Sequence, residues 1–302
     1  MKRRTTTIII SVILFLFALG LTLYPVVANY VNQKYASEVH TAYLEVVEQA
    51  DDTALQEAKE MAVCYNQAII PGTAVTDAYS KEAILSASEN YDHQLNVTGD
   101  GIMGYIEIPN ISVNLPIYHG TGSDSLERGV GHLLGSSLPV GGESTHAILT
   151  GHSGMASQKM FTDLVQVEVG DVFYLHILDE TLAYQVRELN TVLPHDTSLL
   201  GISTGEDLCT LITCTPYGVN THRLLVTGNR IPYEEAETIV EEQVQQEQPR
   251  STWEEKYMAG IVAGILAVLI VALVVGIVMQ IRKIIAQHSR YGKYRGGRHV
   301  QK

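Results

Sequence analysis

The sequence has little cysteine and no cysteine pattern of the kind that binds metal. Cys64, Cys209 and Cys214 are the only three in 302 residues, and there is no Cys-x-x-Cys pair or His-rich cluster. This argues against a zinc-stabilised fold, and we expect neither a metal site nor a cofactor. Because three is an odd number, at least one thiol is unpaired or bonds to another chain. A reactive cysteine is therefore expected.

Charged side chains are missing from two long stretches, Thr5–Gln33 and Tyr257–Ile281. As helices rising about 1.5 Å per residue, both are long enough to cross a hydrocarbon core about 30 Å thick. We therefore predict transmembrane helices at residues 5–29 and 257–281. Val26-Val27-Ala28 also suits a signal peptidase, so a cleaved signal peptide is the alternative for the first span.

Acidic residues are missing from both ends of the chain. Residues 1–4 and 282–302 contain Lys and Arg but no Asp or Glu. Because short cytoplasmic flanks retain basic residues, we expect both tails in the cytoplasm and residues 34–256 outside the cell membrane. All 33 acidic residues then lie in the outer part, which carries a net charge of about −23 and would repel nucleic acid.

Composition divides the outer part into four segments. Residues 30–70 have apolar side chains at helical spacing and predict an extracellular helical segment. Residues 71–97, which begin at Pro71-Gly72, lack strand character. Residues 98–232 consist of short β-type runs, and residues 233–256 are acidic and Gln-rich, which is typical of a solvated linker or helix.

The β-type runs of residues 98–232 predict a mostly-β fold. Seven or eight short strands in about 135 residues favour a closed barrel or a sandwich. Residues 120–142 are Gly-rich and predict a loop. The predicted strands are Gly104–Ile108, Asn114–Tyr118, Thr145–Thr150, Val172–Leu178, Thr181–Glu188, Leu208–Thr215 and Arg223–Arg230.

Cys214 stands at the end of a predicted strand, where Pro216 stops the ladder and leaves the thiol reachable. Arg223 opens the next strand nine residues later, so a tight antiparallel connection would return it alongside Cys214. A guanidinium there lowers a thiol pKa and can hold the oxyanion of a tetrahedral intermediate. We take Cys64 and Cys209 to be inert.

A proton carrier is best sought at His152, which follows the strand Thr145–Thr150 between two glycines, Gly151 and Gly154. The chain has eleven histidines, and His222 is the main competitor because it adjoins Arg223. Strand neighbours point to opposite faces, however, so His222 and Arg223 cannot easily both face the thiol.

These three positions resemble the catalytic motifs of sortases. The Thr-Leu-x-Thr-Cys signature corresponds to residues 210–214, the Leu-Thr-Gly-His element to residues 149–152, and the family arginine to Arg223, in the family order. The stretches 104–109, 115–120 and 214–223 are most similar to the class C, pilin-polymerising branch. A second, C-terminal span also fits that branch.

The resemblance implies a fold and an activity. The fold is an eight-stranded sortase-type β-barrel with N-terminal helices and two flanking transmembrane helices. The implied enzyme is a cysteine transpeptidase that cuts an LPxTG-like sorting signal of a pilin or surface protein after Thr. Cys214 would hold the acyl group as a thioester, His152 would move the protons, and Arg223 would stabilise the oxyanions. The implied acceptor is a lysine amine of a pilin subunit.

Class C sortases also share a lid with an Asp-Pro-aromatic motif over the active site. Residues 76–80, Thr-Asp-Ala-Tyr-Ser, stand in the corresponding place, with Ala78 where the family has proline. By resemblance, Asp77 would pair with Arg223 and Tyr79 would cover the thiol. Without the fixed φ of proline the lid shape is less constrained, and a plain surface turn is the alternative.

Three other functions remain open at this level. A housekeeping sortase would use the same residues to attach surface proteins to cell-wall peptide, and only its acceptor differs. A hydrolytic cysteine protease would release the acyl group to water. A β-barrel binding module would leave Cys214 buried and without catalytic use.

Overall fold

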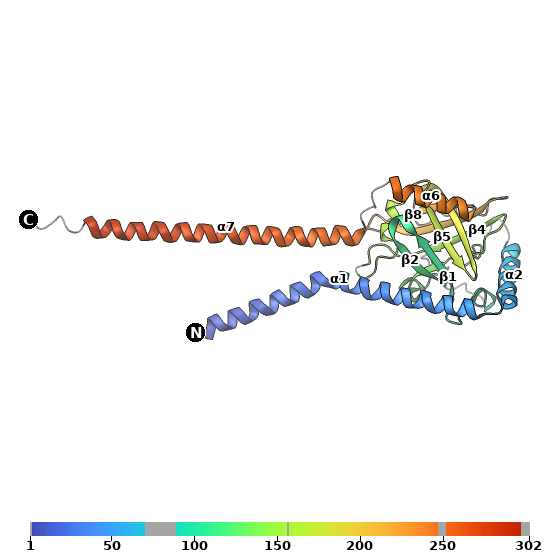
Figure 1. The fold of residues 1–302 in the computed structure, drawn as a ribbon, viewed down its shortest axis with the longest axis horizontal. Helices are drawn as coiled ribbons and strands as arrows, with labels where there is room; N and C mark the ends of the chain where they lie inside the picture. Colours follow the sequence, from blue (N-terminus) through green and yellow to red (C-terminus); the bar gives the residue numbers. More distant parts are fainter. Residues whose placement is uncertain (1, 70–88, 156, 247–251, 297–302) are drawn as a thin grey trace, which may run out of the picture. The chain divides into compact units, whose positions relative to one another are not determined.

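The computed structural model describes residues 2–69, 89–155, 157–246 and 252–296 (Figure 1). Contacts divide the chain into two units, Met1–Trp253 and Glu254–Lys302. The first contains a β-barrel with helices packed on it, and the second contains most of one long helix.

Eight strands close into a barrel in the order β1-β2-β3-β4-β7-β8-β6-β5, with β5 paired back to β1. Most neighbours are antiparallel, but β2 pairs with β3 and β4 pairs with β7 in parallel. The predicted mostly-β, eight-stranded barrel is thus confirmed. The strands are β1 (Ile102–Ile108), β2 (Val113–His119), β3 (Val130–His132), β4 (Thr145–Thr150), β5 (Val172–Ile177), β6 (Glu180–Val192), β7 (Asp207–Thr215) and β8 (His222–Ile231).

The stretch 120–142, predicted to be a loop, contains the strand β3 and the short helix α5 (Ser123–Leu126). The prediction of a continuous loop was wrong because β3 has only three residues, too few to show alternation. Only glycine fits at position 131 of β3, because a Cβ there would lie 2.4 Å from the carbonyl oxygen of Gly120, which is too close.

The helical elements precede, connect and follow the strands. They are α1 (Lys2–Gln49), α2 (Asp52–Ala68), α4 (Glu89–Asp92), α6 (Tyr233–Gln246) and α7 (Trp253–Gly296), with 3-10 turns η1 (Pro109–Ile111) and η2 (Thr162–Gln166). Within Ile9–Gln49 of α1 and Trp253–Ile285 of α7 there is a stretch long and apolar enough, by length and composition, to cross a membrane.

The C-terminal half of α1 packs on the barrel beside β1 and β2 (Figure 1). Tyr43, 1% exposed, donates from its hydroxyl to the Met103 carbonyl at 3.2 Å and accepts from the Leu178 amide at 2.8 Å. Val47 and the α2 residues Leu55 and Ala62 join the same apolar core. Burying each large apolar side chain contributes about 1.5–3 kcal/mol, so these helices are part of the folded domain.

Strand β7 is buried on both faces. Cys209 and Leu211 point into the main core, while Ile212 belongs to a second apolar cluster on the outer face of the barrel. Leu200, from the β6–β7 connection, covers that outer cluster. Residues at alternate positions of β7 therefore lie either inside the barrel or under this connection.

Candidate active site

The hairpin of β7 and β8 places Cys214 directly opposite Arg223 in the antiparallel ladder. Directly opposed residues lie on the same face with their Cβ atoms about 4.5–5.5 Å apart. By alternation this is the outer face, shared with Ile212. Both side chains are half-buried, so they remain reachable from solvent.

The competitor His222 occupies a different place. It pairs with Thr215 in the ladder, one residue beyond Cys214, so its side chain leaves the opposite face of the hairpin. Its ring Nδ1 is 2.9 Å from the Thr221 hydroxyl. The alternation expected from sequence therefore separates His222 from the thiol.

His152 reaches the same strand end from β4. Thr150, two residues before His152, pairs in parallel with Ile212, two residues before Cys214. The Gly151 amide donates to the Ile212 carbonyl at 3.0 Å. These contacts bring the imidazole-bearing segment to the strand end that carries the thiol.

Two side-chain hydrogen bonds fasten this segment to β7. The Thr213 hydroxyl donates to the Gly151 carbonyl at 2.7 Å, and the Ser153 hydroxyl donates to the Cys214 carbonyl at 2.5 Å. They bracket His152 from both sides in sequence. Neither Thr213 nor Ser153 was identified from the sequence as a residue that holds His152. Strand alternation does place the Thr213 side chain on the inner face of the barrel, opposite to Cys214.

The environment of His152 disfavours its charged form. Partial burial lowers the pKa of the imidazole, and the negative charge of Glu127 acts in the opposite direction and raises it. At neutral pH the ring is therefore mainly the neutral base. Glu127, an exposed residue after α5, was not identified from sequence because it lies 25 positions away.

Three other histidines serve the fold. His132 is fully buried, burial lowers its pKa to about 4, and its ring bonds to Tyr91 and the Ser137 carbonyl. His146 bonds to Thr210 and the Gly201 carbonyl, and His119 bonds to two carbonyl groups. Their ring nitrogens are thus used in structural contacts.

The other two cysteines lie elsewhere. Cys209 is 0% exposed in the barrel interior, and burial raises the pKa of its thiol, which keeps it protonated. Cys64 is exposed on α2. The proposed lid residues Asp77 and Tyr79 lie outside the described residues. Within the described ranges, no group of three His, Cys, Asp or Glu side chains could hold a metal ion.

Comparison with known proteins identifies the class. The sortase domain family matches residues 106–231. Sortase A of Streptococcus agalactiae serotype III is 31% identical over 139 residues, which is 45% of this chain and 53% of that protein. Sortase D of Bacillus subtilis is 31% identical over 131 residues, which is 42% of this chain and 63% of that protein. The matches thus span less than two thirds of these curated relatives.

Several solved structures of sortases C match more completely. The sortase C of Streptococcus pneumoniae has 43% identity and a TM-score of 0.59, covering 65% of this chain and 97% of that one. Sortase C1 of Streptococcus agalactiae has 44% identity and a TM-score of 0.59, covering 66% and 96%. Sortase C-1 of Actinomyces oris has 46% identity and a TM-score of 0.55, covering 59% and 99%.

The chain therefore belongs to the sortase family, a family of cysteine transpeptidases that act on sorting signals. The three sortase C structures are matched over nearly their whole length. The resemblance inferred from the sequence motifs is confirmed.

Proposed function

We propose that this chain is a class C sortase that joins pilin subunits, with Cys214 as nucleophile, His152 as general acid and base, and Arg223 as oxyanion stabiliser. The observation that carries the proposal is the cross-strand pairing of Cys214 with Arg223 beside the segment that bears His152. The crystal structure of the pneumococcal sortase C bears on pilin substrate specificity, and the 43% identity with that enzyme supports the same substrate class here.

In the first half of the reaction, the neutral His152 ring takes the thiol proton of Cys214, and the resulting thiolate attacks the Thr carbonyl carbon of an LPxTG-like signal. The C–S bond forms as the carbonyl π electrons move to oxygen, and the Arg223 guanidinium stabilises that oxyanion. Collapse breaks the Thr–Gly C–N bond while protonated His152 gives its proton to the leaving Gly amine. A thioester on Cys214 and a neutral imidazole remain.

In the second half, the lysine amine of a pilin subunit attacks the thioester. His152 accepts the amine proton, Arg223 stabilises the second oxyanion, and the C–S bond breaks to return the thiolate. The product is an isopeptide bond. A thioester suits this transfer because its weak resonance leaves the carbonyl open to an amine.

The two apolar helices support a membrane-anchored arrangement. Basic flanks at residues 1–4 and 282–302 favour cytoplasmic ends, and the acidic barrel then works outside the cell membrane. In that location the enzyme meets secreted substrates that carry sorting signals. Cysteine labelling of the intact cell checks the topology: the exposed Cys64 should react with a membrane-impermeant maleimide.

The activity is tested with the full chain in detergent, an LPxTG-type peptide and a pilin domain. Mass spectrometry should find an acyl adduct on Cys214 and an isopeptide product that contains a pilin lysine. Cys64→Ser is the matched control, because it removes an exposed thiol outside the site and should keep the adduct. Product only with a cell-wall peptide amine would point to the housekeeping role, and no adduct at all would contradict the enzyme.

A further inference from the structure

The segment that carries His152 is irregular, and the chain that follows it in sequence holds it in place. Between β4, which ends at Thr150, and β5, the residues that the structure describes form no strand. The His152 carbonyl accepts the Phe161 amide at 3.0 Å, and the Gly154 amide donates to the Thr162 hydroxyl at 3.1 Å. The position of His152 therefore depends on where residues 159–163 lie.

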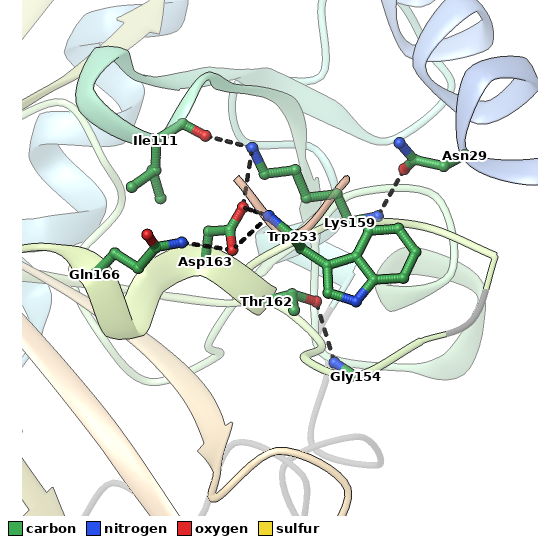
Figure 2. A network of polar contacts seen from close by, with 8 residues as sticks. All are labelled: Asn29, Ile111, Gly154, Lys159, Thr162, Asp163, Gln166 and Trp253. Carbon is green, nitrogen blue, oxygen red and sulfur yellow. Dashed lines mark hydrogen bonds and ion pairs between the residues drawn. The ribbon is translucent and has the colours of Figure 1, made fainter. Parts of the chain in front are cut away.

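Residues 159–163 are fixed by a buried ion pair. The Lys159 Nζ atom lies 3.2 Å from an Asp163 carboxylate oxygen, and the two side chains are 7% and 5% exposed. The ammonium also donates to the Ile111 carbonyl, and Gln166 donates to Asp163 at 2.7 Å (Figure 2). Removing both charges from water costs several kcal/mol per ion, so such a pair is poor evidence for stability and better evidence for a required geometry.

The same five residues are contacted from two distant parts of the chain. Asn29, 1% exposed on α1, accepts the Lys159 backbone amide at 2.8 Å. The Trp253 amide donates to both Asp163 carboxylate oxygens, at 3.0 and 3.2 Å. Figure 2 shows Asn29 at the Lys159 backbone amide and the Trp253 amide at the Asp163 carboxylate. Asn29 is the last residue of the first predicted transmembrane segment, residues 5–29, and Trp253 lies just before the second, residues 257–281.

We propose that Asn29, Lys159 and Asp163 are positioning residues for His152, through which the chain segments next to both apolar helices set the geometry of the active site. This role rests on the proposed function. The contacts that carry this role are made with residues 159–163 and with Ile111. They act through the backbone of residues 159–163, where the Thr162 amide donates to the Lys159 carbonyl at 2.9 Å, and from there through the bonds of Phe161 to His152 and of Thr162 to Gly154.

A purely structural role would predict something different. A contact that only stabilises the fold changes the melting temperature and leaves kcat of the folded enzyme unchanged. A positioning contact changes kcat, because displacing a catalytic group by about 1 Å can cost as much as 100-fold. KM should change little, since the peptide is bound by other groups.

Asn29 gives the first test, with Asn66 as matched control. Asn66 is also a buried helical asparagine, 8% exposed, and it bonds to the Leu138 backbone away from the His152 segment. In the full chain, Asn29→Ala should lower kcat about tenfold with KM within twofold. Asn29→Asp, which keeps an oxygen acceptor, should recover most of it. Asn66→Ala should lower the melting temperature and keep kcat.

A readout without turnover accompanies the kinetics. Hydrogen exchange of the peptide 152–163, measured by mass spectrometry, should speed up in Asn29→Ala and in the apolar double variant Lys159→Met/Asp163→Leu, but not in Asn66→Ala. The double variant should retain most of the thermal stability, because apolar replacement of a buried pair is often neutral.

The outcomes separate two failures. A wild-type chain that forms no acyl-enzyme overturns the proposed function and this role with it. An active wild type overturns the positioning role alone if Asn29→Ala keeps kcat and exchange, if Asn29→Asp recovers nothing, or if Asn66→Ala lowers kcat as much.

Discussion

The proposed active site joins two regions that are built in different ways. Cys214 and Arg223 are held by a continuous ladder of backbone hydrogen bonds between adjacent strands of one hairpin. His152 lies on an irregular segment fastened by side chains, and residues 159–163 that support it are contacted from Asn29, 130 positions away. One half of the site therefore follows from local strand pairing, and the other half depends on the completed fold.

The two halves of the site should therefore differ in how sensitive they are to single substitutions. A ladder distributes its constraint over many hydrogen bonds, so no single substitution outside the two functional side chains should move the thiol and the guanidinium apart. The His152 segment has few restraints, so individual hydrogen bonds should matter.

Removal of either reacting group should abolish activity to the same extent. Cys214→Ala and His152→Ala should each lower kcat by about 10⁴-fold or more, and the double variant should be no worse, because groups that act as a unit are not additive. Peptide turnover followed by chromatography measures this. A double variant much slower than either single variant would show that the two regions act separately.

Arg223 should contribute to catalysis through the planar set of N–H donors of its guanidinium and not only through its positive charge. Arg223→Ala should lower kcat about 10²- to 10³-fold, and Arg223→Lys should recover only part of it, because an ammonium cannot present the same planar donors. Arg230→Lys is the matched control on the same strand, since its guanidinium lies over the Tyr184 ring at the far end of β8. Full activity of Arg223→Lys would show that a positive charge alone suffices at this position.

Single hydrogen bonds between the two regions should have intermediate effects. Thr213→Val keeps the shape of a fully buried side chain and removes its 2.7 Å bond to the Gly151 carbonyl. We expect kcat to fall about tenfold, since losing a buried hydrogen bond costs about 1–3 kcal/mol. Thr210→Val is the control on the same strand, because its hydroxyl bonds to Thr227 and His146. Equal losses of kcat in both variants would contradict the idea that the His152 segment depends on individual hydrogen bonds more than the β7–β8 hairpin does.

The hairpin half was predictable from sequence because its information is local. The β-branched run ending at Cys214, the stop at Pro216 and the nine-residue return to Arg223 together define a turn between antiparallel strands. The cross-strand register follows from such a turn, and the structure has the expected pair. The motifs around Cys214 and His152 also sufficed to recognise the family.

The restraints on His152 were not predictable in the same way. Nothing in the residues around Lys159 indicates that its amide meets Asn29, because the contact spans 130 positions and forms only when α1 docks on the barrel. Asp163 has the sequence context of an ordinary surface acid, yet it is 3% exposed. Strand β3 was missed for a related reason, since its pairing partners on β2 and β4 define it better than its own three residues do.

The smallest predicted effect concerns the protonation of His152. Partial burial lowers its pKa below the usual 6.5 and Glu127 partly offsets this, so a histidine-labelled NMR titration should give a midpoint below 6.5. Glu127→Gln removes the stabilising negative charge and should lower the midpoint further, which moves the acid limb of kcat/KM to lower pH. Asp124→Asn, an exposed acid on α5, should leave it unchanged.

The same titration reports whether the His152 segment is docked. Burial is the largest cause of the lowered pKa, so the pKa should respond when the irregular segment moves away from the barrel. Asn29→Ala should therefore let water reach the ring and move the midpoint back up towards 6.5, whereas Asn66→Ala should not. A midpoint above 6.5 in the wild type would mean that nearby negative charge, and not burial, dominates the pKa of His152. The segment that carries His152 would then leave the ring accessible to solvent.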